Sequence, residues 1–96
     1  MTAVVSWSDQ ARADLGDFID HYALRDFAFA ESISTKAVAA TRLLALHPHA
    51  GQQIRDQALR KWPVAKTPLL LIYEVDGRSV QIVRLVHNRS DWQTLF

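Results

Sequence analysis

The side chains best suited to chemistry lie in the second half of the chain. They are three cations and an imidazole, Arg60, Lys61, Arg84 and His87. His87 suits proton transfer near neutral pH, because the unperturbed pKa of an imidazole is about 6.5. Arg60 and Arg84 stand beside apolar runs, where an unpaired charge is costly. We therefore expect each guanidinium to reach the surface or to meet an anionic partner, and both are our first candidates for a functional site.

The spacing of Arg84 and His87 limits how they can cooperate. They are three residues apart in a run that is typical of a strand. Side chains three apart on a regular strand point to opposite faces. A catalytic pair would therefore require a bulge or a strand end between them.

Other kinds of site find little support. His47 and His49 form a pair without a third ligand at a recognisable spacing, so we expect no metal site. Neither Ser79 nor Ser90 lies on a glycine-flanked turn from strand to helix, as the nucleophile of a hydrolase triad would. The chain has no cysteine and only three glycines, which excludes thiolate chemistry and glycine-rich phosphate loops. We expect no cofactor.

Composition indicates one ordinary globular domain spanning residues 1–96. Hydrophobic residues make up 49% of the chain and charged residues 22%, which argues against disorder. The first fifty residues carry four cations against six carboxylates, and the rest carry seven against four. The second half can thus offer a positive field to an anionic partner. The longest apolar run is far shorter than the roughly 20 residues of a bilayer span, and we expect a cytoplasmic location without membrane contact.

The first half predicts a strand and two helices. Residues 3–7 are rich in β-branched and aromatic types, and Ser8 can cap the helix that follows. Gly16 within that helix predicts close packing by a neighbour. Each helix carries an apolar stripe with spacings of three and four, which predicts an antiparallel hairpin. The stripes are Ala11, Leu15, Phe18 and Tyr22, then Phe29, Ile33, Ala37, Ala40 and Leu44.

The second half predicts antiparallel strands. Residues 60–64 contain Pro63, which places this strand at an edge or a bulge. Residues 69–75 are apolar at successive positions, as in a buried central strand. The pair Asp76-Gly77 predicts a tight turn into a partner strand over residues 79–87. The fold class is therefore α+β, with a helical hairpin packed on a small antiparallel sheet.

Several segments together resemble the RelE/ParE family of bacterial type II toxins, over nearly the whole chain. They are Trp7-Ser8-x-x-Ala11-x-x-Asp14-Leu15, His47-Pro48-x-x-Gly51, Arg60, Pro68-Leu69-Leu70-Leu71-Ile72-Tyr73 and Ile82-Val83-Arg84-Leu85-Val86-His87-x-Arg89-x-Asp91-Trp92. The resemblance implies a small cytoplasmic toxin in a hetero-oligomer with a cognate antitoxin, ParD-like or RelB-like, whose flexible tail wraps it. Coupled folding lets such a tail cover a large surface.

The resemblance implies two alternative targets. ParE-like members poison DNA gyrase by binding it and need no catalytic residues, which makes plasmid stabilisation and growth inhibition the expected roles. RelE-like members are endoribonucleases that cut messenger RNA on the ribosome. Such cleavage needs a base, an acid and cations for the phosphorane. The near-zero net charge offers little attraction to phosphate, so we favour gyrase inhibition. A non-toxic paralogue that only binds an antitoxin is the third possibility.

The candidate residues divide by role. For a nuclease they would be Arg60, Lys61, Arg84 and His87. The residues expected to bind the target are Arg60, Tyr73, Arg84, His87, Arg89 and Trp92. The residues expected to contact the antitoxin are Leu15, Phe18, Tyr22, Arg60 and Trp62. Tyr73, Trp62 and Trp92 have a plainer interpretation as core residues, which we favour. We expect the guanidinium groups of the later strands to emerge together on one open face, with an antitoxin carboxylate as their partner.

Overall fold

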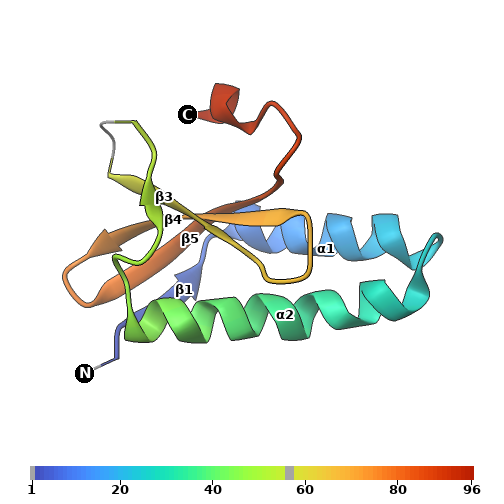
Figure 1. Ribbon diagram of the computed structural model, residues 1–96, viewed down its shortest axis with the longest axis horizontal. Helices are drawn as coiled ribbons and strands as arrows, with labels where there is room; N and C mark the ends of the chain where they lie inside the picture. The colour runs from blue at the N-terminus through green and yellow to red at the C-terminus, as the bar shows by residue number, and fades with distance from the viewer. Residues whose placement is uncertain (1, 56–57) are drawn as a thin grey trace.

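Two helices cover one face of a five-stranded sheet in the computed structural model, which describes residues 2–55 and 58–96 (Figure 1). The elements in chain order are β1 (Val4–Trp7), α1 (Asp9–Ala23), α2 (Phe27–Leu46), β2 (Gln52–Gln53), β3 (Leu59–Pro63), β4 (Leu69–Asp76), β5 (Ser79–His87) and a short 3-10 helix η1 (Trp92–Leu95). None of the helices in the described ranges is long and apolar enough to cross a membrane.

The sheet has the strand order β1-β5-β4-β3-β2. The strands β3, β4 and β5 pair antiparallel in that order, as predicted, and β2, which was not predicted, adds to β3 in the same sense. The first strand, β1, instead joins the edge of β5 in parallel. The sheet is therefore mixed rather than wholly antiparallel, and the α+β class is confirmed. A parallel pair needs a long crossover between its strands, and here α1, α2 and three strands supply it.

The helix boundaries follow from their caps. The Ser8 hydroxyl accepts a hydrogen bond from the Ala11 N–H at 3.0 Å, and the Asp26 carboxylate accepts one from the Phe29 N–H at 3.0 Å. Each bond satisfies a backbone donor that a helix start leaves free. The Ser8 hydroxyl also donates to the Val83 carbonyl at 2.8 Å. The start of α1 is thereby fixed to the middle of β5.

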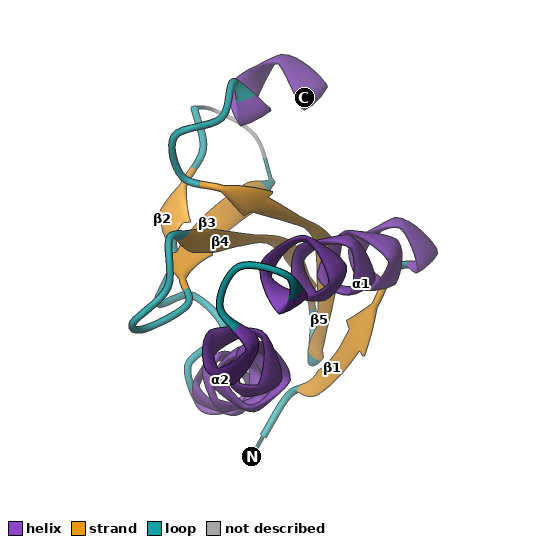
Figure 2. Cartoon of the chain, turned by 90° about the vertical axis from the view of Figure 1, so that its right-hand side faces the viewer, coloured by secondary structure: helices purple, strands orange, loops and turns teal. Residues whose placement is uncertain are grey.

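The middle of the sheet is buried on both faces. On one face, Ile33 and Leu44 of α2 meet Leu71, Tyr73 and other strand residues. On the other face, Trp92 of η1 covers residues that include Ile72 and Val86. Figure 2 shows this arrangement, with the helices on one side of the sheet and the C-terminal segment on the other. The buried run in β4 is explained by its two covered faces.

A β-bulge shifts the pattern of β5. Ile72 pairs with Arg84 while the next residue, Tyr73, pairs with Ile82, so Val83 is the extra residue. Ile82 and Leu85 therefore lie on the same, helix-covered face although they are three apart. The bulge precedes Arg84 and does not lie between Arg84 and His87.

Two local predictions need correction. Nothing lies within 4 Å of a Cβ built on Gly16, so the predicted close packing there is wrong. The turn between β4 and β5 consists of Gly77 and Arg78, one residue later than predicted, since Asp76 still pairs with Ser79. Gly77 has a φ of 58°, a value that glycine adopts without steric cost.

Candidate functional site

Arg84 is bound by a carboxylate of the same chain. Its Nε donates to Oδ2 of Asp14 at 2.8 Å, and its Nη2 donates to Oδ1 at 3.1 Å. The Leu85 N–H donates to Oδ2 at 3.0 Å, so the buried Asp14 ties α1 to β5. The hydrogen bonds to Asp14 raise the pKa of the Arg84 guanidinium above its ordinary value. The anionic partner expected for Arg84 therefore comes from α1, and an antitoxin carboxylate is not needed to neutralise it.

Arg60 holds the loop that follows α2. Its Nη1 donates to the Gly51 carbonyl at 2.8 Å and to the His49 carbonyl at 3.3 Å. Tyr73 holds the same loop, because its hydroxyl donates to the Pro48 carbonyl and accepts from the Gly51 N–H, both at 2.8 Å. Tyr73 has no exposed surface, and burial raises the pKa of its hydroxyl. In this structure Arg60 and Tyr73 position the loop, and Tyr73 cannot touch a partner.

Arg60 and Arg84 lie on opposite faces of the sheet. Directly paired residues of antiparallel strands share a face. Arg60 pairs with Tyr73, which belongs to the helix-covered face, whereas Arg84 pairs with Ile72, which belongs to the other face. The prediction that these guanidinium groups emerge together is wrong. The reason is that Tyr73 and Ile72 are successive residues of β4, whose side chains alternate.

Arg84 and His87 nevertheless line one shallow hollow of about 330 Å³ between α1, β5 and the C-terminal segment. β1 pairs with β5 only as far as Ile82, so no strand of the described residues continues along that edge beyond it. The Arg84 side chain reaches Asp14 across this edge. The His87 ring nitrogen Nδ1 lies 3.1 Å from the Arg89 N–H, which donates to it. The open edge, and not a bulge, brings Arg84 and His87 to one hollow.

The remaining residues predicted to bind the target divide between surface and core. Arg89 is exposed, whereas Trp92 is only 5% exposed and packs against the sheet. The Lys61 ammonium lies 5.6 Å from the centre of the Trp92 ring, a cation–π contact. Trp92 is thus a core residue of the face away from the helices, as the plainer interpretation held.

The residues predicted to contact an antitoxin are half-buried. Leu15, Phe18 and Tyr22 pack against the core from α1, and the Tyr22 ring meets the Phe29 ring edge-on at 4.8 Å. Trp62 is half-buried as well and lines a separate apolar groove beside α2. Their contact with a partner stays a prediction.

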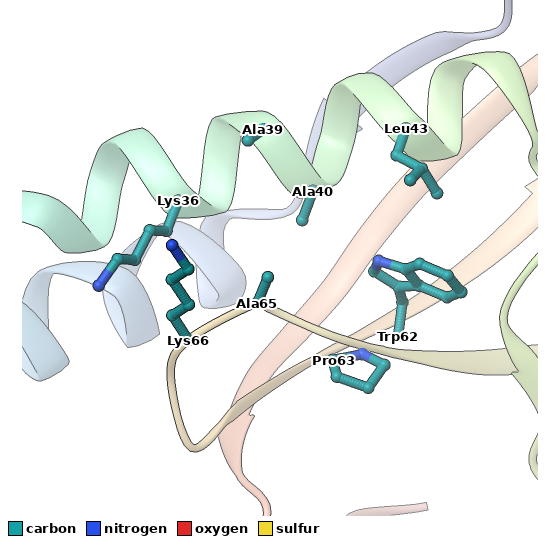
Figure 3. Close-up of a pocket in the computed structure, with 8 residues that line it drawn as sticks. All are labelled: Lys36, Ala39, Ala40, Leu43, Trp62, Pro63, Ala65 and Lys66. Atoms are coloured by element: carbon teal, nitrogen blue, oxygen red, sulfur yellow. The ribbon is translucent and has the colours of Figure 1, made fainter.

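Sequence reasoning missed two features. One is the loop after α2, where the role of Gly51 depends on a residue 22 positions later in the chain. The other is the groove beside α2, which also involves Ala39, Leu43 and Lys66 (Figure 3). Leu43, an apolar residue outside the helical stripe, was the available signal for the groove. No local signal indicated the loop contacts.

The fold has solved counterparts among bacterial toxin–antitoxin proteins. A chain of the chromosomal ParDE system from P. aeruginosa superposes with a TM-score of 0.78 at 22% identity, covering 90% of this chain and 96% of its own. A chain of the RelBE2 toxin–antitoxin complex from Mycobacterium tuberculosis superposes with a TM-score of 0.60 at 19% identity, covering 91% of this chain and 99% of its own. No curated protein matched the sequence.

The structural likenesses show the fold, and the amino-acid sequence shows the family. The family model described as the ParE toxin of the type II toxin–antitoxin system parDE matches residues 5–92, which is most of the chain. The chain therefore belongs to the ParE toxin family of type II toxin–antitoxin systems.

Proposed function

We propose that this toxin inhibits DNA gyrase by binding it and is neutralised by a cognate antitoxin. The observation that carries the proposal is the state of the two strongest candidate cations. Arg84 donates two hydrogen bonds to the Asp14 carboxylate, and Arg60 donates to backbone carbonyls of the loop after α2. Both groups serve the fold, which suits a toxin that acts through its surface.

The same geometry argues against ribonuclease activity. Cleavage of a phosphodiester needs several cations and an acid–base group that converge on one phosphate. Here Arg60 and Lys61 lie on opposite faces of β3, and the charge of Arg84 is already compensated. His87 shares a hollow with Arg84 and with the exposed carboxylate of Asp17, which repels a phosphate.

An antitoxin partner is supported by family membership and by the names of the solved counterparts. The parDE description pairs a toxin with an antitoxin, and the RelBE2 structure is a toxin–antitoxin complex. We extend this pairing to the present chain. The expected assembly is a hetero-oligomer in which the antitoxin covers apolar surface of the toxin.

Inducing the chain alone in a bacterial host separates the three candidate functions. We expect growth arrest with a DNA-damage response, while incorporation of labelled amino acids continues at first. Purified toxin should convert gyrase into cleaved-DNA complexes, with topoisomerase IV as the matched control enzyme. Translation arrest with intact DNA would overturn the proposal in favour of messenger RNA cleavage, and unimpaired growth would favour a non-toxic paralogue.

A further inference from the structure

The C-terminal segment, residues 88–96, is joined to the sheet by a single backbone hydrogen bond within the described part of the chain. The Asn88 N–H donates to the Pro68 carbonyl at 2.8 Å, directly after the last pair of β4 and β5, Leu69 with His87. From Arg89 onward, the described hydrogen bonds of the segment end on acceptors within residues 87–93. Asn88 is therefore the last residue that continues the β4–β5 ladder.

Hydrogen bonds inside the segment give it a local structure of its own. The Ser90 N–H and hydroxyl both donate to the His87 carbonyl, at 3.0 and 2.7 Å. The Thr94 N–H and hydroxyl likewise donate to the Asp91 carbonyl, at 3.2 and 2.8 Å. None of these bonds reaches another element, so the segment can leave the sheet without breaking them one after another.

Trp92 holds the segment against the sheet. Its side chain is only 5% exposed and packs in a cluster with Ile72 and Val86, and the Lys61 ammonium lies 5.6 Å from the centre of its ring. Phe96 is half-buried against the same cluster. The side chains of residues 88–91 and 93–95 are exposed. Trp92 therefore supplies most of the apolar surface that the segment buries.

The same segment forms part of the hollow that contains Arg84 and His87. Ser90 and Leu95 line this hollow together with residues of α1 and β5. The Arg89 N–H donates to Nδ1 of His87 at 3.1 Å, so the acceptor nitrogen of the ring is occupied while the segment is docked. Undocking would remove Ser90 and Leu95 from the hollow and free this nitrogen.

These contacts favour two states, docked and undocked, over gradual fraying from the end. Regions with few buried apolar contacts open at a lower free energy than the rest of a protein. A segment this short, with one 3-10 turn, does not keep its structure away from the sheet, because short helices are marginal in water. Loss of the Trp92 contact should therefore release all of residues 88–96 together.

We propose that residues 88–96 form a strap that opens as one unit at Asn88, is held closed by Trp92, and controls access to the hollow of Arg84 and His87. The inference concerns the free chain and does not depend on the identity of the target. The strap joins the part of the chain with the least long-range hydrogen bonding to the hollow that holds the strongest acid–base candidate.

Amide hydrogen exchange of the full chain, followed by NMR, tests the opening. The reporters are the hydrogen-bonded amides of Asn88, Ser90, Thr94 and Phe96, and the amides of β4 report global unfolding. We expect the four strap amides to share one protection factor within about threefold, and to exchange about a hundredfold faster than the β4 amides. Protection that falls steadily from Asn88 to Phe96 would indicate fraying and overturn the proposal, as would protection equal to that of β4.

Two variants test what holds the strap closed, each with a matched control. Trp92→Phe should lower the protection of all four strap amides at least tenfold, whereas Gln93→Ala, an exposed position on η1, should leave it within twofold. Lys61→Gln should lower it about two- to fivefold, the factor that an exposed cation–π contact is worth, and Lys66→Gln, exposed on another turn, should not. If Trp92→Phe loosens β4 as much as the strap, Lys61→Gln decides the point, and unchanged strap protection in that variant overturns the role of Trp92.

Modification of His87 by diethyl pyrocarbonate tests access to the hollow. The reagent attacks an unprotonated imidazole nitrogen, and mass spectrometry compares the rate at His87 with that at the exposed His49. We expect Trp92→Phe to raise the ratio of the two rates at least threefold, because opening frees Nδ1 from the Arg89 N–H. An unchanged ratio in a variant whose strap amides exchange faster would overturn the control of access.

Discussion

The Asp14 carboxylate neutralises the Arg84 guanidinium and also ties α1 to β5. It accepts hydrogen bonds from two nitrogens of Arg84 and from the Leu85 N–H, and it is only 7% exposed. Removing one partner of a buried ion pair leaves an uncompensated charge, which costs more than the pair contributes. Alanine at Arg84 would therefore impair the fold as well as any surface that Arg84 offers.

Asp14→Asn should lower the free energy of unfolding by about 2–3 kcal/mol. The cost is below that of a fully buried pair because 26% of the Arg84 side chain is exposed. Urea denaturation measures it, and Asp17→Asn, an exposed neighbour on α1, is the control and should change stability by less than about 0.5 kcal/mol. Equal effects of the two substitutions would show that the Arg84 contact adds nothing to stability.

Tyr73→Phe should cost about 1–2 kcal/mol, because the Gly51 N–H and the Pro48 carbonyl both lose their partner. It should also change the alkaline limb of stability. Burial raises the pKa of Tyr73 above 10.0, so the unfolded chain loses this proton first, and stability falls as pH rises past that value. Urea denaturation between pH 8 and 11 should show a shallower decline in Tyr73→Phe. An identical slope in wild type and Tyr73→Phe would refute the assignment.

At the scale of elements, local signals and long-range contacts account for different parts of the fold. Ser8, the two apolar stripes and the Gly77 turn region are local, and they predicted both helices and the β4–β5 hairpin. The bulge at Val83 lies in a strand segment that carries no glycine, which is the local signal that often marks a bulge. The parallel docking of β1 likewise depends on where the whole helical hairpin places it.

Two glycines should respond oppositely to alanine. Gly16→Ala should raise stability by about 0.5–1 kcal/mol, because an exposed helical glycine loses more backbone entropy than alanine and its Cβ meets nothing. Gly51→Ala should lower stability by about 1–3 kcal/mol, since its Cβ would lie 2.7 Å from the Lys61 carbonyl and would also meet the Tyr73 hydroxyl. Thermal unfolding of the two variants measures both effects. A destabilised Gly16→Ala would indicate a contact that the free chain does not show.

At the scale of the whole molecule, the two cations that the sequence singles out, Arg60 and Arg84, stabilise the fold through contacts within the chain. The chain has a net charge of +1, and its two best-placed guanidinium groups bind internal acceptors on opposite faces of the sheet. Sequence reasoning identified these residues but could not see that Asp14, 70 positions away, already neutralises one of them. Such a molecule attracts phosphate weakly, and its exposed apolar groove suits recognition of proteins.

His87→Gln tests this distinction between binding and catalysis. A glutamine oxygen can accept the Arg89 N–H in place of the ring nitrogen, but an amide cannot exchange protons near neutral pH. If the toxin acts by binding gyrase, His87→Gln should retain growth inhibition and gyrase cleavage within about threefold of wild type. The control is His49→Gln, an exposed position in the loop held by Arg60, whose contact with that guanidinium is through the backbone carbonyl. Removal of an acid–base group is expected to lower activity at least a hundredfold. If His87→Gln is folded and loses toxicity by that factor while His49→Gln stays active, the result would support messenger RNA cleavage instead of gyrase binding.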